Sequence, residues 1–461
     1  MAAKITKIGI TSDKISGRGG IALFLAYVDN IGLYALISNH IRPLLVLGLK
    51  GLGLEQFLKQ IFAFFIDGTD SAISGFDKKK KDEGYAAVLE NDLDQQASSH
   101  QIKRFFLKMA LIPNSVFNFI LHELFIWRLK MVSPKIIILG IDTMVLNNDD
   151  ADKREGCEPT YKKKKGFQPL HLCWGPFLID VLFRKGSAHS NHGTDYSDRV
   201  TAVVNLIRTR YNPDVPIVLC ADSGFADQKA YHVFESLLHV SYITTGKLYP
   251  EVKDYVRELQ VENFNELSKN NAIWKYTEFG HMLKSWSKVR RCIFTKLERD
   301  QKGQSILEFA KPDSIIFTNI GLGGRSDEYL KKAGMGSYFQ TEKIIETSHQ
   351  RGADELIHRS IKELATKEQL PFKSFSMNQS YYLLLVITHF MFEAHKQDVT
   401  VGVIPVTSYP NTYRRKIIDI AVKVTSSARS VCLRFTQTIF DTINIVDLWA
   451  KCQNPENRIM T

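Results

Sequence analysis

The sequence predicts an α/β protein with a helical N-terminal region and a β-rich stretch inserted into the α/β part. Three observations lead to this fold class. Residues 1–130 carry apolar side chains at helical spacing and show few strand signals. From residue 131 onward, short β-branched runs alternate with helical segments, which is typical of an α/β sheet. Between residues 251 and 340 this alternation gives way to strand-like runs separated by polar turns.

The N-terminal region is expected to be a set of packed helices. Residues 21–37 and 54–65 are rich in apolar side chains. An amphipathic segment follows Ser98, and serine is a preferred N-cap residue, so we expect a helix to begin there. The cations that this helix would turn toward solvent are Lys103, Arg104 and Lys108. Two interpretations stay open: a helix-turn-helix contact with DNA, or a bundle helix with a basic face.

Two predicted strands of the α/β part end at an aspartate. Residues 135–142 (KIIILGID) and 216–222 (PIVLCAD) are β-branched runs of the kind that form buried strands. Folds of this class place their sites at strand ends, so Asp142 and Asp222 are candidate functional residues. The other elements expected here are strands at 170–179, 180–183 and 241–245, and helices at 196–210 and 226–238.

The segment from residue 251 to residue 340 is expected to be a mostly β insertion. A helix that contains Glu355 then returns the chain to the α/β part. Further strand-like runs lie at 291–295, 314–318, 416–424 and 431–435, and a helix is expected at 377–395. We therefore expect five parts, with bounds 1–130, 131–250, 251–340, 341–400 and 401–461.

Composition narrows the classes of function. The 461 residues carry a net charge of +11, which favours a polyanionic partner, although a merely basic soluble protein is the alternative. The six cysteines form no close pair, which argues against a zinc ribbon or a disulfide framework and favours a reducing cytoplasm. The longest apolar run, residues 381–392, is shorter than the ~20 residues of a membrane span and contains Thr388 and His389. We expect a buried helix there and no membrane association.

The segment from Ser348 to Lys362 is the most informative stretch of the chain. As a helix, it places Arg351, Glu355 and Lys362 on one side, at steps of four and seven residues. Its opposite, apolar side carries Leu356, Ile357, Ile361 and Leu364. A carboxylate flanked by two cations indicates a metal ion held beside a phosphate.

Asp142 and Asp222 are the expected partners of this glutamate. Hard divalent cations take oxygen ligands, mostly carboxylates, and Mg²⁺ keeps positions for water and phosphate. Two such ions about 4 Å apart activate the attacking oxygen and stabilise the leaving oxygen. Either aspartate alone would more often be a solvated loop residue, so the inference depends on the three acids together.

Several ordered motifs resemble those of one known family. They are Leu139–Thr143 (LGIDT), Tyr161–His171 (YKKKKGFQPLH), Arg184–Asn191 (RKGSAHSN), Ala221–Phe225 (ADSGF) and the trio Arg351, Glu355 and Lys362. In this order they resemble the DDE transposases of bacterial insertion sequences that carry a Tyr-Arg-Glu-Lys signature, over roughly residues 50–440. Ser348 stands where that signature has its tyrosine. If the tyrosine helps to bind the phosphate of the element's end, this chain binds it more weakly or through another group.

The resemblance implies a fold and a chemistry. The fold would be a ribonuclease H-like core with a β-rich insertion between the second aspartate and the glutamate. Asp142, Asp222 and Glu355 would bind two Mg²⁺ ions, with Mn²⁺ as a substitute, and Arg351 and Lys362 would contact phosphates. Water would free a 3′-hydroxyl at the element's inverted-repeat end, and that hydroxyl would attack target DNA. A homodimer on double-stranded DNA, in the bacterial cytoplasm with the nucleoid, would be the working form.

Further residues are candidate DNA contacts. Trp286 lies among cations, and some relatives cut the second strand through a hairpin and stack a flipped base on a tryptophan. Core packing is the alternative for Trp286, as a solvated loop is for Lys163 and Lys164 and a turn cap is for His189. Two other functions stay open: a ribonuclease H-like nuclease without strand transfer, and a transposase-derived DNA-binding protein, against which the retention of all three acids argues.

Overall fold

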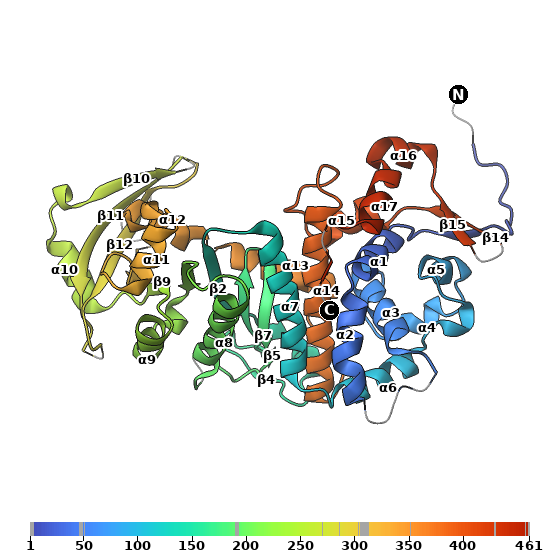
Figure 1. Cartoon of the computed structure of the whole chain (residues 1–461), viewed down its shortest axis with the longest axis horizontal. Helices are drawn as coiled ribbons and strands as arrows, with labels where there is room; N and C mark the ends of the chain where they lie inside the picture. The colour runs from blue at the N-terminus through green and yellow to red at the C-terminus, as the bar shows by residue number, and fades with distance from the viewer. Residues whose placement is uncertain are drawn as a thin grey trace. The chain divides into compact units, whose positions relative to one another are not determined.

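The computed structural model divides the chain into two compact units (Figure 1). We call residues 121–359 the sheet unit, and residues 1–120 together with 360–461 the helical unit. The structure describes residues 4–459 except 46–48, 50, 190–192, 270, 285, 303, 305–312, 351, 428–429 and 457, and leaves out the side chains of 261 and 352–354. The five-part division expected from the sequence stays a prediction.

A nine-stranded mixed sheet forms the centre of the sheet unit. Its strand order is β10-β11-β12-β13-β9-β8-β2-β6-β7. The strands are β2 (Ile137–Thr143), β6 (Leu170–Trp174), β7 (Phe177–Leu182), β8 (Ile217–Ala221), β9 (Ser241–Gly246), β10 (Asn265–Lys269), β11 (Ala272–His281), β12 (Arg290–Arg299) and β13 (Ser314–Thr318). The mixed α/β class predicted from the sequence is confirmed.

Strand direction changes across the sheet. The pairs β7-β6 and β6-β2 are antiparallel, and β2-β8 and β8-β9 are parallel. Parallel neighbours need a crossover connection, which α8 (Asp195–Arg210) supplies before β8 and α9 (Gln228–His232) with the π-helical turn Val233–Leu237 supplies before β9. The strands β10 to β13, which lie in the predicted insertion, extend this same sheet beyond β9 through antiparallel pairs.

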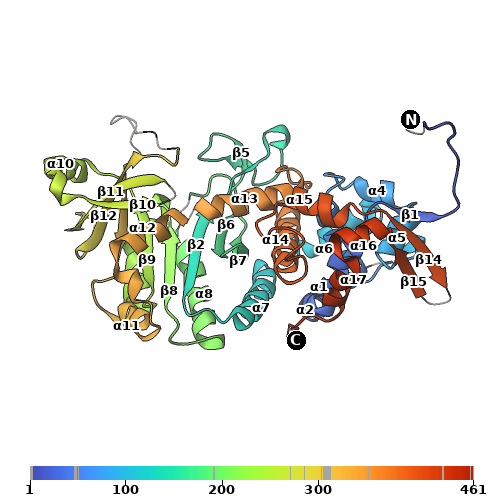
Figure 2. The same ribbon diagram turned by 90° about the horizontal axis from the view of Figure 1, so that it is seen from above.

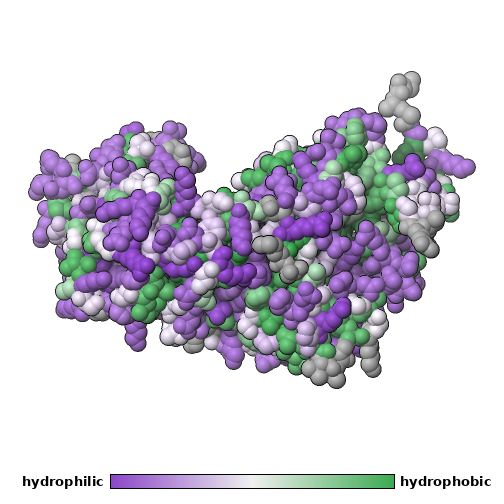
Figure 3. All heavy atoms as spheres, viewed as in Figure 1, coloured by the Kyte–Doolittle hydropathy of each residue, from purple (hydrophilic) through white to green (hydrophobic). Residues whose placement is uncertain are grey.

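Shorter elements complete the sheet unit. A small sheet has the order β3-β5-β4. These strands are β3 (Leu146–Asn147), β4 (Glu158–Pro159) and β5 (Lys165–Phe167). The remaining helices are α7 (Asn114–Val132), α10 (Pro250–Glu258), α11 (Arg325–Lys332), α12 (Thr341–Gln350) and α13 (Gly352–Ala365), of which α7 and α13 continue into the helical unit. Hydrophilic residues predominate over the visible face of the sheet unit in Figure 3.

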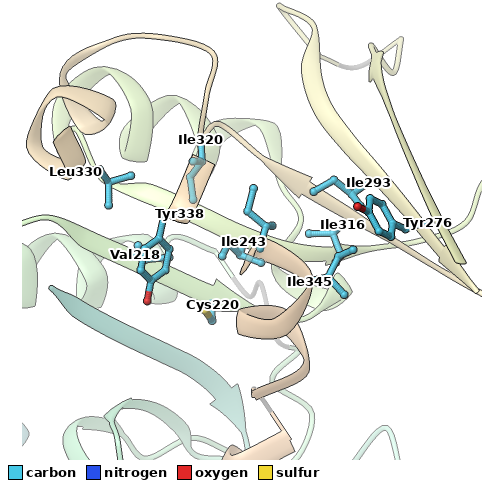
Figure 4. Close-up of a cluster of buried hydrophobic side chains, with 11 residues drawn as sticks. Val218, Cys220, Ile243, Tyr276, Ile293, Ile316, Ile320, Leu330, Tyr338 and Ile345 are labelled. Atoms are coloured by element: carbon cyan, nitrogen blue, oxygen red, sulfur yellow. The ribbon is translucent and has the colours of Figure 1, made fainter. Parts of the chain in front are cut away.

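One face of the sheet is covered by α11 and α12. Figure 4 shows Val218, Ile243 and Ile316 of neighbouring strands in one cluster of buried side chains with Ile345 of α12. Leu330 of α11 packs into the same cluster. Residues two apart in a strand share a face, so the β-branched runs of these strands supply an apolar layer for the helices.

Two strand boundaries differ from those predicted. The expected strands at 170–179 and 180–183 are β6 and β7, with the turn between Trp174 and Phe177. Gly175 adopts a φ of +55° there, a conformation that glycine takes at little cost. In the expected strand at 416–424, residues Arg414–Ile418 form a π-helical turn instead, and β14 begins at Val422.

The helical unit is built mainly from helices that pack around α14 (Phe375–Asp398). Its other helices are α1 (Ile21–Asn30), α2 (Leu33–Ile41), α3 (Leu54–Asp67), α4 (Gly75–Lys79), α5 (Glu83–Val88), α6 (Ser99–Met109), α15 (Pro410–Tyr413), α16 (Gln437–Ile443) and α17 (Ile445–Gln453). A small sheet, β1 (Lys14–Ser16), β14 (Val422–Ser427) and β15 (Ser430–Arg434), completes it. The predicted start of α6 is confirmed, because the Ser98 hydroxyl accepts a hydrogen bond from the backbone N–H of Gln101. Lys103 and Arg104 of α6 are exposed.

The buried helix predicted at residues 381–392 lies within α14, which is buried along most of its length. Two of its own buried side chains, Glu393 and Lys396, form an ion pair at 2.9 Å. Burial raises the pKa of Glu393 to about 7. Among the residues that the structure describes, no single helix has the length and hydropathy to cross a membrane. Two bent pairs of helices meet the same criterion when each pair is taken together, by length and composition alone. They are Ile21–Asn30 with Leu33–Leu44 and Ser99–Met109 with Asn114–Val132.

Arg414 ties two helix ends together inside the helical unit. Its guanidinium donates hydrogen bonds to the carbonyls of Phe65 and Ile66, in the last turn of α3. It also donates to the carbonyls of Glu363 and Leu364, in the last turn of α13. A helix leaves its last carbonyls without partners, so a buried arginine that binds four of them fixes the ends of both helices.

Candidate active site

Asp142 and Asp222 lie at matching positions on neighbouring strands. In the parallel pair β2-β8, Ile141 is opposite Ala221, and each aspartate follows its member of that pair by one residue. Adjacent strands are about 4.8 Å apart, so the two carboxylates leave the sheet side by side at its carboxyl edge. Figure 2 shows β2 beside β8.

A backbone N–H orients each aspartate. Asp142 Oδ1 accepts a hydrogen bond from the Thr143 N–H at 2.7 Å, and its side chain is 16% exposed. Asp222 Oδ1 accepts one from the Gly224 N–H at 2.8 Å and caps the short 3₁₀ turn Ser223–Phe225. Both carboxyl groups are therefore held in place and partly open to solvent, as ligands of a hydrated cation need to be.

Helix α13, which carries the third predicted acid, lies beside Asp142. His358 of α13 lies with its Nδ1 atom 4.0 Å from Asp142 Oδ2. Glu355 stands one helical turn before His358, on the same face of the helix, and is exposed. Within the described residues, no group of three or more His, Cys, Asp or Glu side chains is arranged to bind a metal. The structure thus pairs the two aspartates and places Glu355 on the adjoining helix, with the three carboxylates not gathered around one point.

The other residues of the predicted helix are distributed differently. Arg351 lies outside the described residues, between the end of α12 at Gln350 and the start of α13 at Gly352. Lys362 lies in the part of α13 that belongs to the helical unit and pairs with Glu368 at 3.0 Å. On the predicted apolar side, Ile357, Ile361 and Leu364 are buried, whereas Leu356 is 54% exposed. Leu356 does not share the buried side with Ile357, because one step along a helix turns a side chain by about 100°.

Lys163 and Lys164, which belong to the predicted motif Tyr161–His171, lie in the turn between β4 and β5. Lys163 is exposed and has a φ of +57°. Lys164 is also exposed and lies 3.2 Å from Asp149. His189 is exposed, and its backbone carbonyl accepts a hydrogen bond from Arg184 at 3.1 Å.

A cavity of about 410 Å³ lies next to Asp222. It is lined by Ser223 and Gly224, which follow that aspartate directly, and by Tyr161, Gln168, His189, Ala226, Asp227, Gln228, Lys247, Tyr249, Leu283, Trp286 and Phe317. The aromatic rings and the lysine among these residues suit a ligand that is both flat and anionic. His189 and Trp286 were predicted from the sequence as DNA contacts, whereas Lys247 and Tyr249 were not, because they belong to no motif.

Trp286 is both a packed residue and a wall of this cavity. It is 7% exposed and packs edge-on against Phe317, with ring centroids 4.8 Å apart. The guanidinium of the fully buried Arg290 lies 4.7 Å from its ring centroid. Core packing therefore accounts for most of its surface, as the alternative interpretation of this residue expected.

Two histidines at the site were not predicted as functional residues. His171 Nδ1 lies 3.4 Å from His358 Nε2, and His171 is opposite Asp142 in the β2-β6 pair. A signal was present in the sequence, since His358 follows Glu355 by three residues and therefore shares its helix face.

Comparison with known proteins identifies the class. A family model described as Transposase DDE domain group 1 matches residues 3–454. The chain therefore belongs to this family of DDE-domain transposases, which implies an enzyme that acts as a nuclease or transposase. Enzymes of this kind generally use divalent metal ions.

The other comparisons add little to this assignment. Among solved structures, the chain is similar to the piggyBac transposase in a synaptic complex with hairpin DNA, with a TM-score of 0.41 and 11% identity over 88% of this chain and 82% of that chain. No curated protein matches the chain in sequence.

Proposed function

We propose that this protein is the transposase of a bacterial insertion sequence, cutting DNA at terminal inverted repeats and joining the freed 3′-hydroxyl to target DNA. The observation that carries the proposal is the pair of strand-end aspartates beside α13, in a chain that belongs to a DDE transposase family. Asp142 and Asp222 come from parallel neighbours, so they share one edge of the sheet, and Glu355 stands on the helix that adjoins it.

The order of the strands supports a ribonuclease H-like core. Strands β7, β6 and β2 form an antiparallel meander, and β8 and β9 add in parallel through helical crossovers. The first acid then lies next to the last residue of the central strand, and the second directly follows its parallel neighbour. The strands β10 to β13, between Asp222 and Glu355, are the proposed insertion.

The donor set fits divalent cations. Asp142, Asp222 and Glu355 would hold two Mg²⁺ ions, with Mn²⁺ as a substitute, because hard cations prefer carboxylate oxygens. Such ions, when bound, lower the pKa of water and offset the charge that develops on phosphate oxygens. The protein's own contribution is to orient the aspartates through the N–H groups of Thr143 and Gly224.

The reaction would proceed in two displacements. Water attacks the phosphodiester at the element's terminus, and the leaving group is the oxygen that departs as the 3′-hydroxyl. That hydroxyl then attacks a phosphodiester of the target, and a target 3′-oxygen departs. Arg351 and Lys362 are proposed to bind the phosphates of the element's end, Arg351 through a bidentate fork.

The most direct test is to incubate the purified protein with Mg²⁺ and DNA from the gene's own flanks, and to map the ends produced. Cuts at a short inverted repeat, followed by joined products, would support the proposal. Cleavage without joined products would instead indicate a nuclease, and binding without cleavage a DNA-binding protein. We further propose that a homodimer on DNA, in the bacterial cytoplasm with the nucleoid, carries out the reaction.

Binding to the element's end should depend steeply on salt. Each neutralised phosphate contributes a slope of about 0.9 to the plot of log affinity against log salt. Lys163 is exposed in the loop after the first aspartate, so Lys163→Ala should lower the slope by about 0.9. The matched control is Lys78→Ala, because Lys78 is 72% exposed and paired with Asp70. An unchanged slope for Lys163→Ala in a fluorescence-anisotropy titration would remove Lys163 from the interface.

The cavity beside Asp222 supports a hairpin step. If Trp286 stacks a flipped base there, Trp286→Ala removes a contact worth ~1–3 kcal/mol, so hairpin formation should fall about tenfold while first-strand nicking is spared. Trp286 also packs against Phe317, and Trp286→Phe keeps more of that packing. Gel analysis of nicked and hairpin products separates the two steps. Equal loss of both steps in both variants would show that the residue only holds the fold.

A further inference from the structure

We infer that His358 is a positioning residue, which seats α13 against the carboxyl end of β2 and so determines where Glu355 stands. This inference rests on the proposed function, because it assigns the docking of the helix that carries the proposed third metal ligand. It concerns His358 and its partner His171, neither of which is among the three acids.

The two imidazoles connect the helix to the sheet. His171 belongs to β6, is 1% exposed and lies opposite Asp142 in the antiparallel β2-β6 pair. Its Nδ1 atom lies 3.4 Å from Nε2 of His358, and the two rings are tilted by 56° with centroids 5.4 Å apart. A buried strand residue therefore provides a fixed point for a helix residue, at the place where the first aspartate leaves the sheet.

The second nitrogen of His358 faces the first aspartate. Nδ1 of His358 lies 4.0 Å from Asp142 Oδ2, which is longer than a direct hydrogen bond. His358 is thus a neighbour of that carboxylate and also lies 3.4 Å from His171. His358 of α13 therefore lies between His171 of β6 and Asp142 of β2, and all three residues belong to the sheet unit.

The contact between His358 and His171 also affects the position of Glu355, because both Glu355 and His358 belong to α13. Glu355 and His358 are three residues apart, so a rotation of α13 about its axis would move both side chains together. Ile357, one residue from His358, is buried, and its apolar contacts are not directional. The imidazole pair is directional and lies one helical turn from Glu355.

The far half of α13 is held independently. In the helical unit, Ser360 Oγ lies 2.9 Å from Nε2 of the buried His389, and Arg414 binds the carbonyls of Glu363 and Leu364. Loss of His358 should therefore leave the helix formed and anchored at its C-terminal end. The expected defect is in the placement of Glu355 and not in folding.

The test compares His358→Ala with His358→Gln in the full-length protein. Residues that orient metal ligands typically contribute 10–100-fold, so we expect His358→Ala to lower the kcat of end cleavage by about 10–100-fold and to weaken Mn²⁺ binding similarly. The KM for end DNA should stay within about twofold. His358→Gln, whose amide can still bond His171, should restore most of both losses. His232→Ala, an exposed histidine of α9, is the matched control.

Two readouts keep the inference open to contradiction. Mn²⁺ binding is followed by electron paramagnetic resonance, and the melting temperature of each variant reports on folding. Equal losses in the Ala and Gln variants, or Mn²⁺ affinity and kcat within twofold of wild type in His358→Ala, would overturn the inference. Should the wild-type protein cut no DNA, the proposed function fails, and the Mn²⁺ titration alone still decides whether His358 organises the acids.

Discussion

Asp142→Asn and Asp222→Asn should each reduce Mg²⁺-dependent end cleavage by about a thousandfold or more. A metal ion contributes several kcal/mol of charge stabilisation in the transition state, and each 1.4 kcal/mol corresponds to about tenfold in rate. Asparagine keeps the size of the side chain and can still accept the N–H of Thr143 or Gly224, but it removes the anionic oxygen. The local backbone should therefore stay in place while affinity for the cation falls.

The measurement pairs cleavage of a labelled end with its equilibrium binding. Affinity for the end DNA should stay within a few-fold, because many phosphate contacts supply it and removal of one anion does not oppose them. Asp198→Asn serves as the control, since Asp198 is an exposed acid in the first turn of α8 of the same unit. Cleavage that survives in either site variant would remove that aspartate from the catalytic site.

Glu355→Gln is expected to have a comparable effect. Glu355 is exposed on α13 and lies one turn before His358, which adjoins Asp142. Its carboxylate would complete the ligand set, so the amide should lower cleavage by roughly a hundredfold to a thousandfold at nearly unchanged end affinity. Because the side chain is exposed, the melting temperature should hardly change, which separates this effect from a folding defect.

Burst kinetics on a pre-nicked end would locate the defect in either the first cut or the joining step. Glu258→Gln on α10 removes the same charge from an exposed position of the sheet unit and is the control. If Glu355→Gln cuts and joins at the wild-type rate, the third acid must be sought elsewhere. The transposase assignment would then rest on the family and the two aspartates alone.

Strands β2, β8, β9 and β13 could be predicted because they are largely buried on both faces. The β-branched runs ending at Asp142 and Asp222 form β2 and β8, and the runs at 241–245 and 314–318 form β9 and β13. Their adjacency was not visible in the runs themselves. That Ile141 is opposite Ala221 depends on the parallel pairing of segments about 80 residues apart, and local periodicity carries no such information.

The details that the sequence did not reveal have identifiable causes. The boundary between β6 and β7 is set by the positive φ of Gly175, which hydrophobic periodicity does not register. Leu356 was assigned to the apolar side of α13 by residue type, yet its position on the helix turns it to solvent. His171 and His358 come from distant segments, so their contact could be known only from the fold. Arg351 lies outside the described residues, and its proposed role stays a prediction.

We propose that Asp142, Asp222 and Glu355 share a pair of divalent cations when the element's end is bound. A crystal structure of the protein with end DNA and Mn²⁺, with anomalous scattering to locate the ions, tests it most directly. We predict two anomalous peaks about 4 Å apart, each ligated by carboxylate oxygens of these acids. Peaks at other residues, or Glu355 turned away from ions bound to the two aspartates, would contradict it.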